Sequence, residues 1–230
     1  MPVVLLVHCD GTNGSTTFTD VSPSARTLTA GSTCTVSTTS PKFGTGSATF
    51  STNVDNRITV GAPQTDFNFG AGQFTVEAWG NATVTPNGTP QAVVAQFGGS
   101  SNLGWFLGLN GGSLLFFYST TGTDTLSVGG TFAPTLNQWY HLAADRDASN
   151  VLRVYVDGVV KASATVSATL FASTQSTLIG NDNNLNRFWP GRLDEVRVTK
   201  GTAQYGGAFT PPTQAFGTAT TRNPIAYVVS

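Results

Sequence analysis

The sequence predicts an all-β sandwich or barrel, because short strand-like segments recur along the 230 residues while helical periodicity is nearly absent. Apolar residues make up 39% of the chain, which is enough to bury a core. No shift in composition divides the chain, and no repeat of fixed period occurs, so one large domain is expected. Only the segments 62–69 and 202–205 are compatible with a short helical turn.

The predicted strands are bounded by turn residues and are rich in β-branched and aromatic side chains. The apolar opening at residues 3–9 predicts a buried first strand. Residues 74–79 alternate between apolar and other side chains, so that every second side chain shares one face. Further strands are expected at 139–144 and 192–199. Many short strands of this kind favour two packed antiparallel sheets.

Two hairpins are indicated by their turn residues. Asp157-Gly158 separates two valine-rich runs, and Gly111-Gly112 separates two runs rich in leucine and phenylalanine. A two-residue turn of type I′ needs positive φ at both central residues, which Gly, Asn and Asp tolerate best. We therefore expect tight antiparallel pairing across each of these turns.

Charged side chains are scarce, at 10% of the chain, and the net charge is −1. An average globular domain carries roughly 25%. The charge balance gives no footprint for nucleic acid or an anionic membrane, and no apolar run reaches the roughly 20 residues of a membrane span. The apolar opening lacks a basic flank and is too short for a secretory signal, so synthesis in the cytoplasm is expected. The exposed surface must be built from Ser, Thr, Asn, Gln and Gly.

Four segments resemble, in order, the laminin G-like, concanavalin A-like jelly roll in its compact microbial and phage form. They read HCDG at 8–11 with FTD at 18–20, FTVEAW at 74–79, WYHLA at 139–143 with LRVYVDG at 152–158, and GRLDEVRV at 191–198. The resemblance covers about residues 3–216 and implies a concanavalin A-like jelly-roll β-sandwich of two antiparallel sheets. The segments also supply the alternating apolar residues that packed sheets need: Phe74, Val76, Ala78, Leu142, Val154, Val156, Leu193, Val196 and Val198.

The segment 199–212, with TKGTAQY and FTPP, resembles the form common in bacteriophage structural proteins. This resemblance implies a non-enzymatic virion structural protein, with capsid decoration favoured. Its location would be the virion, and its partners the major capsid protein or neighbouring copies. The alternative is a carbohydrate-binding adhesion module, a tail or host-recognition protein that contacts surface glycans. No heptad repeat supports the stalk of a fibre.

Residue patterns for catalysis are absent from the sequence. Glycoside hydrolysis needs two carboxylates about 5–10 Å apart, but Glu77 has no acid two or four residues away. Asp194 and Glu195 are adjacent, so they should point to opposite faces of a strand. The Glu-x-Asp-x-x-Glu pattern of the fold's glucanases does not occur. Neither His8 nor His141 has a Ser or Cys motif beside it, and each is expected to be a satisfied structural histidine.

The resemblance also implies a structural calcium ion, because related jelly rolls often hold one between the N-terminal loop and the last long strand. Asp10 and Asp194 match the positions that would supply carboxylates. Oxygen atoms near Thr12, Asn13 and Asp20 would complete a shell of six to eight ligands. The alternative is that Asp10 and Asp20 cap turns and that Asp194 accepts backbone hydrogen bonds.

The loop at 180–189 has the composition of a sugar site, since Asp182 and Asn184 precede the aromatic Trp189. Turn formation is the alternative explanation for its asparagines. Cys9 and Cys34 lie 25 positions apart, without metal-ligand spacing. Two buried free thiols are expected, and a disulfide is the alternative if their strands are neighbours. The related family usually has an aromatic residue where Cys9 stands.

The jelly-roll domain is assigned to residues 1–216, and a C-terminal arm to 217–230. Within the arm, a strand-like apolar segment at 224–229 follows a polar spacer. In an extended segment, Ile225, Tyr227 and Val229 would alternate onto one side. We predict that these three side chains contact another subunit, as a strand added to the edge of its sheet. The alternative is that the arm folds back onto its own sandwich.

Overall fold

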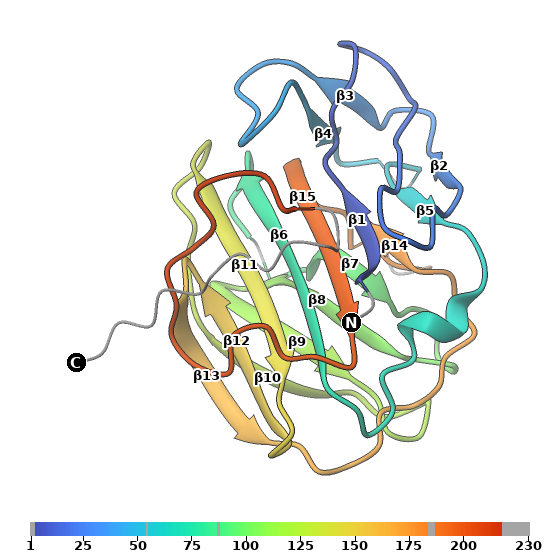
Figure 1. The fold of residues 1–230 in the computed structure, drawn as a ribbon, viewed down its shortest axis with the longest axis vertical. Helices are drawn as coiled ribbons and strands as arrows, with labels where there is room; N and C mark the ends of the chain where they lie inside the picture. The colour runs from blue at the N-terminus through green and yellow to red at the C-terminus, as the bar shows by residue number, and fades with distance from the viewer. Residues whose placement is uncertain (1–2, 54, 87, 184–186, 218–230) are drawn as a thin grey trace.

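The computed structural model describes residues 3–53, 55–86, 88–183 and 187–217. Within these ranges the chain forms two antiparallel sheets that pack face to face, which confirms the predicted all-β jelly-roll sandwich (Figure 1). The short 3-10 helix η1 (Gln64–Phe67) lies inside one of the two segments expected to hold a helical turn, while residues 202–205 form no helix. No helix in these ranges is long and apolar enough to cross a membrane.

Sheet A contains eight strands in the order β13-β12-β11-β6-β15-β4-β3, and β1 pairs with β15 beside this path. Its central strand β6 is buried along its whole length, because other parts of the chain cover both of its faces. The strands of sheet A are β1 (Val3–Val7), β3 (Thr35–Ser37), β4 (Ser47–Phe50), β6 (Phe74–Ala82), β11 (Trp139–Arg146), β12 (Val151–Val156), β13 (Val159–Thr165) and β15 (Gly191–Lys200).

Sheet B contains seven strands in the order β10-β9-β8-β7-β14-β5-β2. Burial alternates residue by residue along β9, so one face of this strand packs on the core while the other is only half-buried. The strands of sheet B are β2 (Leu28–Ala30), β5 (Ile58–Val60), β7 (Gln91–Gln96), β8 (Trp105–Asn110), β9 (Ser113–Tyr118), β10 (Leu126–Thr131) and β14 (Leu178–Ile179).

Both predicted hairpins are present. β12 and β13 pair directly across Asp157 and Gly158, whose φ angles are 47° and 76°. β8 and β9 pair across Gly111 and Gly112, with φ angles of 52° and 84°. Positive φ at both central residues is the geometry of the type I′ turn, whose twist matches that of the flanking strands.

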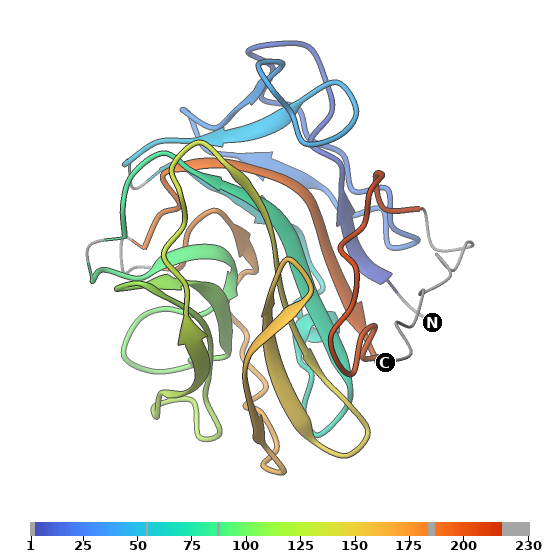
Figure 2. The ribbon, with the colours of Figure 1, turned by 90° about the vertical axis from the view of Figure 1, so that its left-hand side faces the viewer.

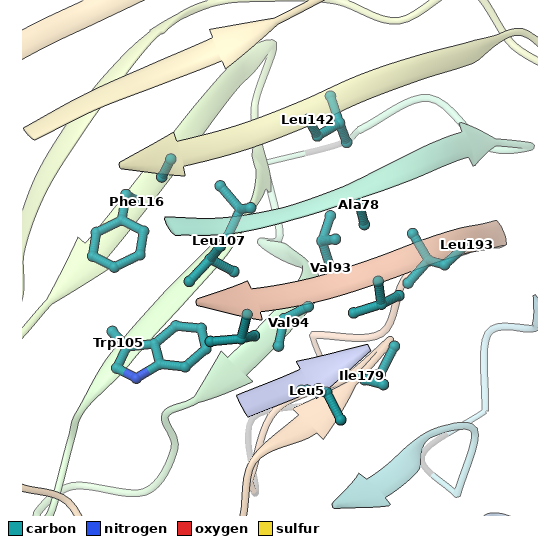
Figure 3. Close-up of a cluster of buried hydrophobic side chains, with 14 of the residues drawn as sticks. Leu5, Ala78, Val93, Val94, Trp105, Leu107, Phe116, Leu142, Ile179 and Leu193 are labelled. Atoms are coloured by element: carbon teal, nitrogen blue, oxygen red, sulfur yellow. The ribbon is translucent and has the colours of Figure 1, made fainter. Parts of the chain in front are cut away.

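The hydrophobic core lies between the two sheets. Figure 3 shows side chains of both sheets meeting there, among them Trp105 and Phe116 from sheet B and Leu142 and Leu193 from sheet A. Burying a large apolar side chain contributes about 1.5–3 kcal/mol before ordering costs, so this layer is the main source of stability. The core includes all nine residues that the sequence predicted: Phe74, Val76, Ala78, Leu142, Val154, Val156, Leu193, Val196 and Val198.

The two cysteines belong to the same core. Cys9 and Cys34 are both buried free thiols, as predicted. Burial raises the pKa of the Cys34 thiol to about 12, and it also raises the pKa of Cys9. Because the thiolate is the reactive form of cysteine, both residues act here as small apolar side chains.

A β-bulge interrupts β15 at Glu195 and shifts the register with β6 between Asp194 and Arg197. Glu195 has a φ angle of 51°, in the left-handed region that non-glycine residues seldom adopt. The extra residue lets both Leu193 and Val196 face the core, although they are three positions apart. Asp194 and Glu195 both bond to segments that cross the outer face of sheet A, so the expectation that they point to opposite faces is wrong.

Residues 201–217, which we call the strap, leave β15 and cross the outer face of sheet A. Figures 1 and 2 show the strap in red, running over β6, β11 and β12 on the side away from sheet B. The Phe209 N–H donates to the carbonyl oxygen of Gly158, and Phe216 is buried near the end of the strap. The strap therefore forms a third layer over the central strands of sheet A.

Candidate functional site

A group of four ionisable side chains lies between sheet A and the strap, around the carboxylate of Glu77. This carboxylate accepts hydrogen bonds from His141 Nε2 at 3.0 Å, from Arg197 Nε at 2.8 Å and from the Tyr205 hydroxyl. The side chains of Glu77 and His141 are both 0% exposed. The group joins β6, β11, β15 and the strap.

The charge state of this group follows from its partners. Burial alone would raise the pKa of Glu77, but the Arg197 guanidinium and the hydrogen bonds from His141 and Tyr205 lower it to about 2. Glu77 is therefore ionised at neutral pH. Glu, His and Tyr are common residues of acid–base catalysis, yet such a residue must come within hydrogen-bond reach of a substrate. Here the strap covers the Glu77 group, so a substrate cannot reach it. The hydrogen bonds of the group instead hold the strap on sheet A.

A second buried carboxylate, Asp145, fixes the next part of the strap. Asp145 Oδ1 accepts the Tyr155 hydroxyl at 2.8 Å, and Oδ2 accepts the N–H groups of Tyr205 at 3.2 Å and Gly206 at 2.8 Å. The ring of Phe209 stacks on that of Tyr205, with an interplanar angle of 4°. Polar and aromatic contacts together define one position for the strap.

The loop at 38–46 covers another part of the outer face of sheet A and is held by two carboxylates. Asp194 Oδ2 accepts the N–H groups of Lys42 at 2.9 Å and Phe43 at 3.1 Å. Asp10 Oδ1 accepts the N–H groups of Thr45 and Gly46. Burial raises the pKa of Asp194 to about 8, against the effect of the backbone hydrogen bonds.

These contacts bear on the calcium ion predicted at Asp10, Asn13 and Asp194. N–H groups face the oxygens of all three, since Asn13 Oδ1 accepts from Thr38 at 3.2 Å, whereas a calcium site gathers oxygen ligands. Asp20 likewise accepts backbone N–H groups. Across the described ranges, no three His, Cys, Asp or Glu residues are grouped to hold a metal ion. In this arrangement the oxygens of Asp10, Asn13 and Asp194 accept backbone N–H groups, which fits the alternative of backbone hydrogen bonding and does not fit a calcium site. The calcium ion itself remains a prediction.

His8 and Glu195 connect the end of the strap to the first strand. His8 Nδ1 lies 2.7 Å from Glu195 Oε1, and Glu195 Oε2 accepts the Phe216 N–H at 2.6 Å. The hydrogen bond with Glu195 raises the pKa of His8. The guanidinium of Arg197 lies 3.9 Å from the centroid of the Phe216 ring. Both histidines therefore bond to a carboxylate, as expected of structural histidines, although the buried Nδ1 of His141 has no hydrogen-bond partner among the described residues.

The loop at 180–189 does not offer the predicted aromatic platform. Trp189 is 1% exposed and packs in the core, where Nε1 donates to the Arg192 carbonyl oxygen at 3.1 Å. The hypothesis that Trp189 stacks on a sugar is therefore wrong, because the ring is buried between the sheets. Asp182 is buried, 3.4 Å from Arg187 Nη1, and Asn184 lies outside the described residues. The predicted contact residues of the arm also lie outside them: Ile225, Tyr227 and Val229.

The outer face of sheet B over β8, β9 and β10 is different in kind, and we call it the β8–β10 face. Leu115 and Phe117 are half-buried at its centre. Leu115 lies across Gly129, where an added Cβ would be only 2.0 Å from Leu115 Cδ2. Strand register places nine residues on this face: Phe106, Gly108 and Asn110 of β8, Ser113, Leu115 and Phe117 of β9, and Ser127, Gly129 and Thr131 of β10.

None of these nine residues is charged. Between residues 78 and 144 the sequence holds a single Asp, Glu, Lys or Arg, which is Asp124, and its carboxylate accepts hydrogen bonds from Ser and Thr residues of its own loop. At one end of the face, the Arg187 guanidinium lies 6.0 Å from the centroid of Phe106 and pairs with Asp182. Sequence reasoning missed this surface, although the charge-free stretch and the alternation in β9 were both visible.

The stacked sheets and the strand order define the class of this protein as a lectin-like jelly-roll sandwich. Residues 51–203 match the family model Laminin_G_3, which is described as the concanavalin A-like lectin/glucanases superfamily. The match covers more than half of the chain, and the protein belongs to this family. No curated protein sequence matches the chain.

Several solved binding domains have a similar fold. The binding domain of Paraclostridial Mosquitocidal Protein 1 is 14% identical, with a TM-score of 0.65 over 88% of this chain and 50% of that chain. The botulinum neurotoxin serotype G binding domain is also 14% identical, with a TM-score of 0.66 over 87% of this chain and 48% of that chain. This chain thus spans about half of each binding domain, and the similarity at this identity concerns the fold alone.

Proposed function

We propose that the protein is a non-enzymatic, lectin-like binding module. The observation that carries the proposal is that the residues suited to acid–base chemistry are tied up with one another: His141 of sheet A and Tyr205 of the strap both hydrogen-bond to the buried carboxylate of Glu77. Glycoside hydrolysis requires two carboxylates on either side of an open cleft, and the Glu77 group has neither the second acid nor the access. The similar folds are those of toxin binding domains, which supports the same conclusion.

Hydrolysis and binding assays test this proposal together. Purified protein is incubated with β-glucan, chitin and peptidoglycan, and new reducing ends are measured. We expect no product above that of the Glu77→Gln variant, together with retention of the protein on one or more bacterial envelope fractions. Hydrolysis that disappears in Glu77→Gln would contradict the non-enzymatic role.

We further propose that the module belongs to a bacteriophage virion, as a capsid decoration protein in contact with the major capsid protein or neighbouring copies. Two features support this setting. The segment 199–212 resembles phage structural proteins, and a surface poor in Lys and Glu suits lasting contact with other subunits. Attachment at the tail, for adhesion to host glycans, is the alternative.

Labelling of purified particles separates these locations. Antibody-gold against the protein, viewed by negative-stain electron microscopy, should mark the capsid regularly if the protein is a decoration, and the tail tip if it is an adhesin. Unlabelled particles would contradict the virion setting. Deletion of residues 217–230 tests the arm, because its predicted use in attachment requires a folded protein that no longer joins the particle.

A further inference from the structure

A row of side chains crosses the outer face of sheet A where β6 ends and β15 begins. Strand register sets four residues in line: Trp139 of β11, Asn81 of β6, Arg192 of β15 and Thr49 of β4. Their chain neighbours Ala82, Leu193 and Ala48 belong to the core, so by strand alternation the row itself faces outward. Residues paired across strands have Cβ atoms about 4.5–5.5 Å apart, which brings neighbouring side chains of the row within reach of one another.

The 38–46 loop crosses this row and encloses its centre. Arg192 Nη1 donates to the Thr39 carbonyl oxygen at 2.7 Å, and Trp139 Nε1 donates to the Ser40 carbonyl oxygen at 3.1 Å. Asn81 lies between these two attachment points and is only 4% exposed. The loop and the two flanking side chains therefore account for the burial of Asn81.

Several polar side chains in and beside the row are not satisfied by the protein. Among the described residues, the side-chain amide of Asn81 and the buried hydroxyl oxygen of Thr49 have no hydrogen-bond partner. Trp79 and Ser47 lie two residues earlier on the same strands, and their Nε1 and Oγ atoms are likewise buried without a partner in the described ranges. A buried polar group without a partner costs free energy, so four of them in two adjacent rows indicate a site for a polar group from outside the chain.

Two cations stand beside this site. Arg192 and Lys42 are partly buried, yet neither forms an ion pair with a described residue. The Lys42 ammonium group lies 3.8 Å from the centroid of the Trp79 ring. Asp194 follows Arg192 by two residues, but its Oδ2 already accepts the N–H groups of Lys42 and Phe43. The charge of Arg192 is therefore open to an anion from outside the chain.

We propose that Arg192, together with Asn81 and Thr49, binds a carboxylate group, and we call this row the Arg192 site. Nη1 of Arg192 is bonded to the loop, whereas Nε and Nη2 donate to no described residue. Their N–H groups point the same way and match the two oxygens of a carboxylate. The Asn81 amide and the Thr49 hydroxyl can donate to the same oxygens. One free guanidinium edge balances one negative charge, which favours a carboxylate over a doubly charged phosphate.

A purely structural role for Arg192 is the competing explanation. In that role Arg192 only ties the 38–46 loop to sheet A, through the single bond from Nη1 to Thr39. This explanation leaves the Nε–Nη2 edge, the Asn81 amide and the Thr49 hydroxyl without a use. A bound carboxylate accounts for all three groups at once, and it predicts a binding signal that a structural tie does not produce.

Titrations followed by ¹H–¹⁵N NMR test the site, because the Asn81 side-chain amide and the Trp139 indole N–H give separate signals. The probes are the peptide acetyl-Gly-Glu-Gly-amide, its uncharged Gln counterpart, sodium acetate and sodium phosphate. We expect the Glu peptide or acetate to shift both signals saturably, and the Gln peptide to shift neither. Equal affinities for acetate and the Glu peptide assign the site to small free carboxylates, and tighter peptide binding assigns it to an acidic side chain of a protein partner.

Matched variants separate the carboxylate site from the structural tie. Arg192→Lys keeps the charge but removes the paired N–H groups, and we expect it to weaken binding roughly tenfold. Thr49→Val removes only an unpartnered hydroxyl, so binding should fall roughly threefold while the Tm is not lowered. Arg57→Lys makes the first change at an exposed arginine paired with Asp55, and it should bind as the wild type does.

Two results would overturn the proposal. Saturable binding of phosphate in preference to both carboxylate probes would show that the ligand class is wrong. No saturable shift with any probe, or carboxylate binding that is unchanged in both Arg192→Lys and Thr49→Val, would show that the row is not a binding site. Neither result bears on the proposed non-enzymatic role, which depends on the Glu77 group.

Discussion

Sheet A and sheet B present outer faces of opposite chemistry. The outer face of sheet A carries Glu77, Asp145 and Arg197, which are covered by the strap and the 38–46 loop. The β8–β10 face of sheet B carries no charge and is left partly exposed. The buried charged side chains over sheet A therefore hold the chain on itself, whereas the β8–β10 face of sheet B is uncharged.

The difference has a physical reason in the composition of the strap. The strap contributes few large apolar side chains, among them Tyr205, Phe209 and Phe216. So few apolar side chains do not by themselves fix the position of the strap on sheet A. Hydrogen bonds to buried carboxylates fix it, although buried charges add little net stability. Among the residues that the structure describes, no segment comparable to the strap covers sheet B over β8–β10.

Among these predictions, removal of Arg197 should cause the largest loss of stability on the sheet A side of the molecule. In Arg197→Ala, the Glu77 carboxylate stays buried without its cationic partner, and we expect a loss of about 3–5 kcal/mol in the free energy of unfolding. Chemical denaturation followed by tryptophan fluorescence measures this loss. Arg57→Ala is the matched control, because the Arg57–Asp55 pair is exposed and should contribute at most about 1 kcal/mol. Similar losses in both variants would mean that the buried group does not fix the strap.

The pH dependence of stability should report the same group. Glu77 has a pKa of about 2 in the folded protein and about 4.3 when unfolded. Its pKa is lowered by folding, so its stabilisation is present above about pH 4.3 and is lost as the pH falls toward 2. Linkage makes this about 3 kcal/mol. Denaturation at pH 7, 4 and 2.5 should show the gap between wild type and Glu77→Gln shrinking as the pH falls, and a constant gap would contradict the assignment.

The carboxylate of Asp194 should have a smaller effect. Asp194→Ala removes the acceptor for the N–H groups of Lys42 and Phe43, which we expect to cost about 1–3 kcal/mol. Thermal unfolding with and without a calcium chelator separates two explanations. Backbone hydrogen bonding predicts the same loss in both conditions. The calcium hypothesis predicts that the chelator lowers the Tm of the wild type but leaves the Tm of the variant unchanged.

Features set by neighbouring residues were predictable from the sequence. The Asp157-Gly158 turn and the alternation of Phe74, Val76 and Ala78 follow local rules of φ angle and strand period, and the structure confirms them. The family segments then placed these strands in two sheets. Strand parity gave the wrong faces for Asp194 and Glu195, because a single inserted residue in a bulge changes which face the following side chains occupy.

The side-chain groups that join distant segments were not predictable in the same way. His141 and Tyr205 lie 64 and 128 positions from Glu77, and no spacing rule connects them. Trp189 illustrates a second limit. The polar composition of its loop suggested a ligand site, but composition does not say whether a ring faces solvent or the core. The neutrality of the β8–β10 face depends on register, which assigns alternate residues of three strands to one side.

The smallest expected effect on stability belongs to the β8–β10 face, and a matched pair of substitutions measures it. Ser127 lies exposed on the outer face of sheet B, so Ser127→Asp should change the free energy of unfolding by no more than about 0.5 kcal/mol. Thr75 lies on the outer face of sheet A and is 0% exposed, and its hydroxyl donates to the Thr202 carbonyl oxygen. The same change there buries a carboxylate beneath the strap and should destabilise the protein severely. Denaturation curves of the two variants decide the matter: equal, large losses would show that the face of sheet B is packed against something that its exposure does not reveal.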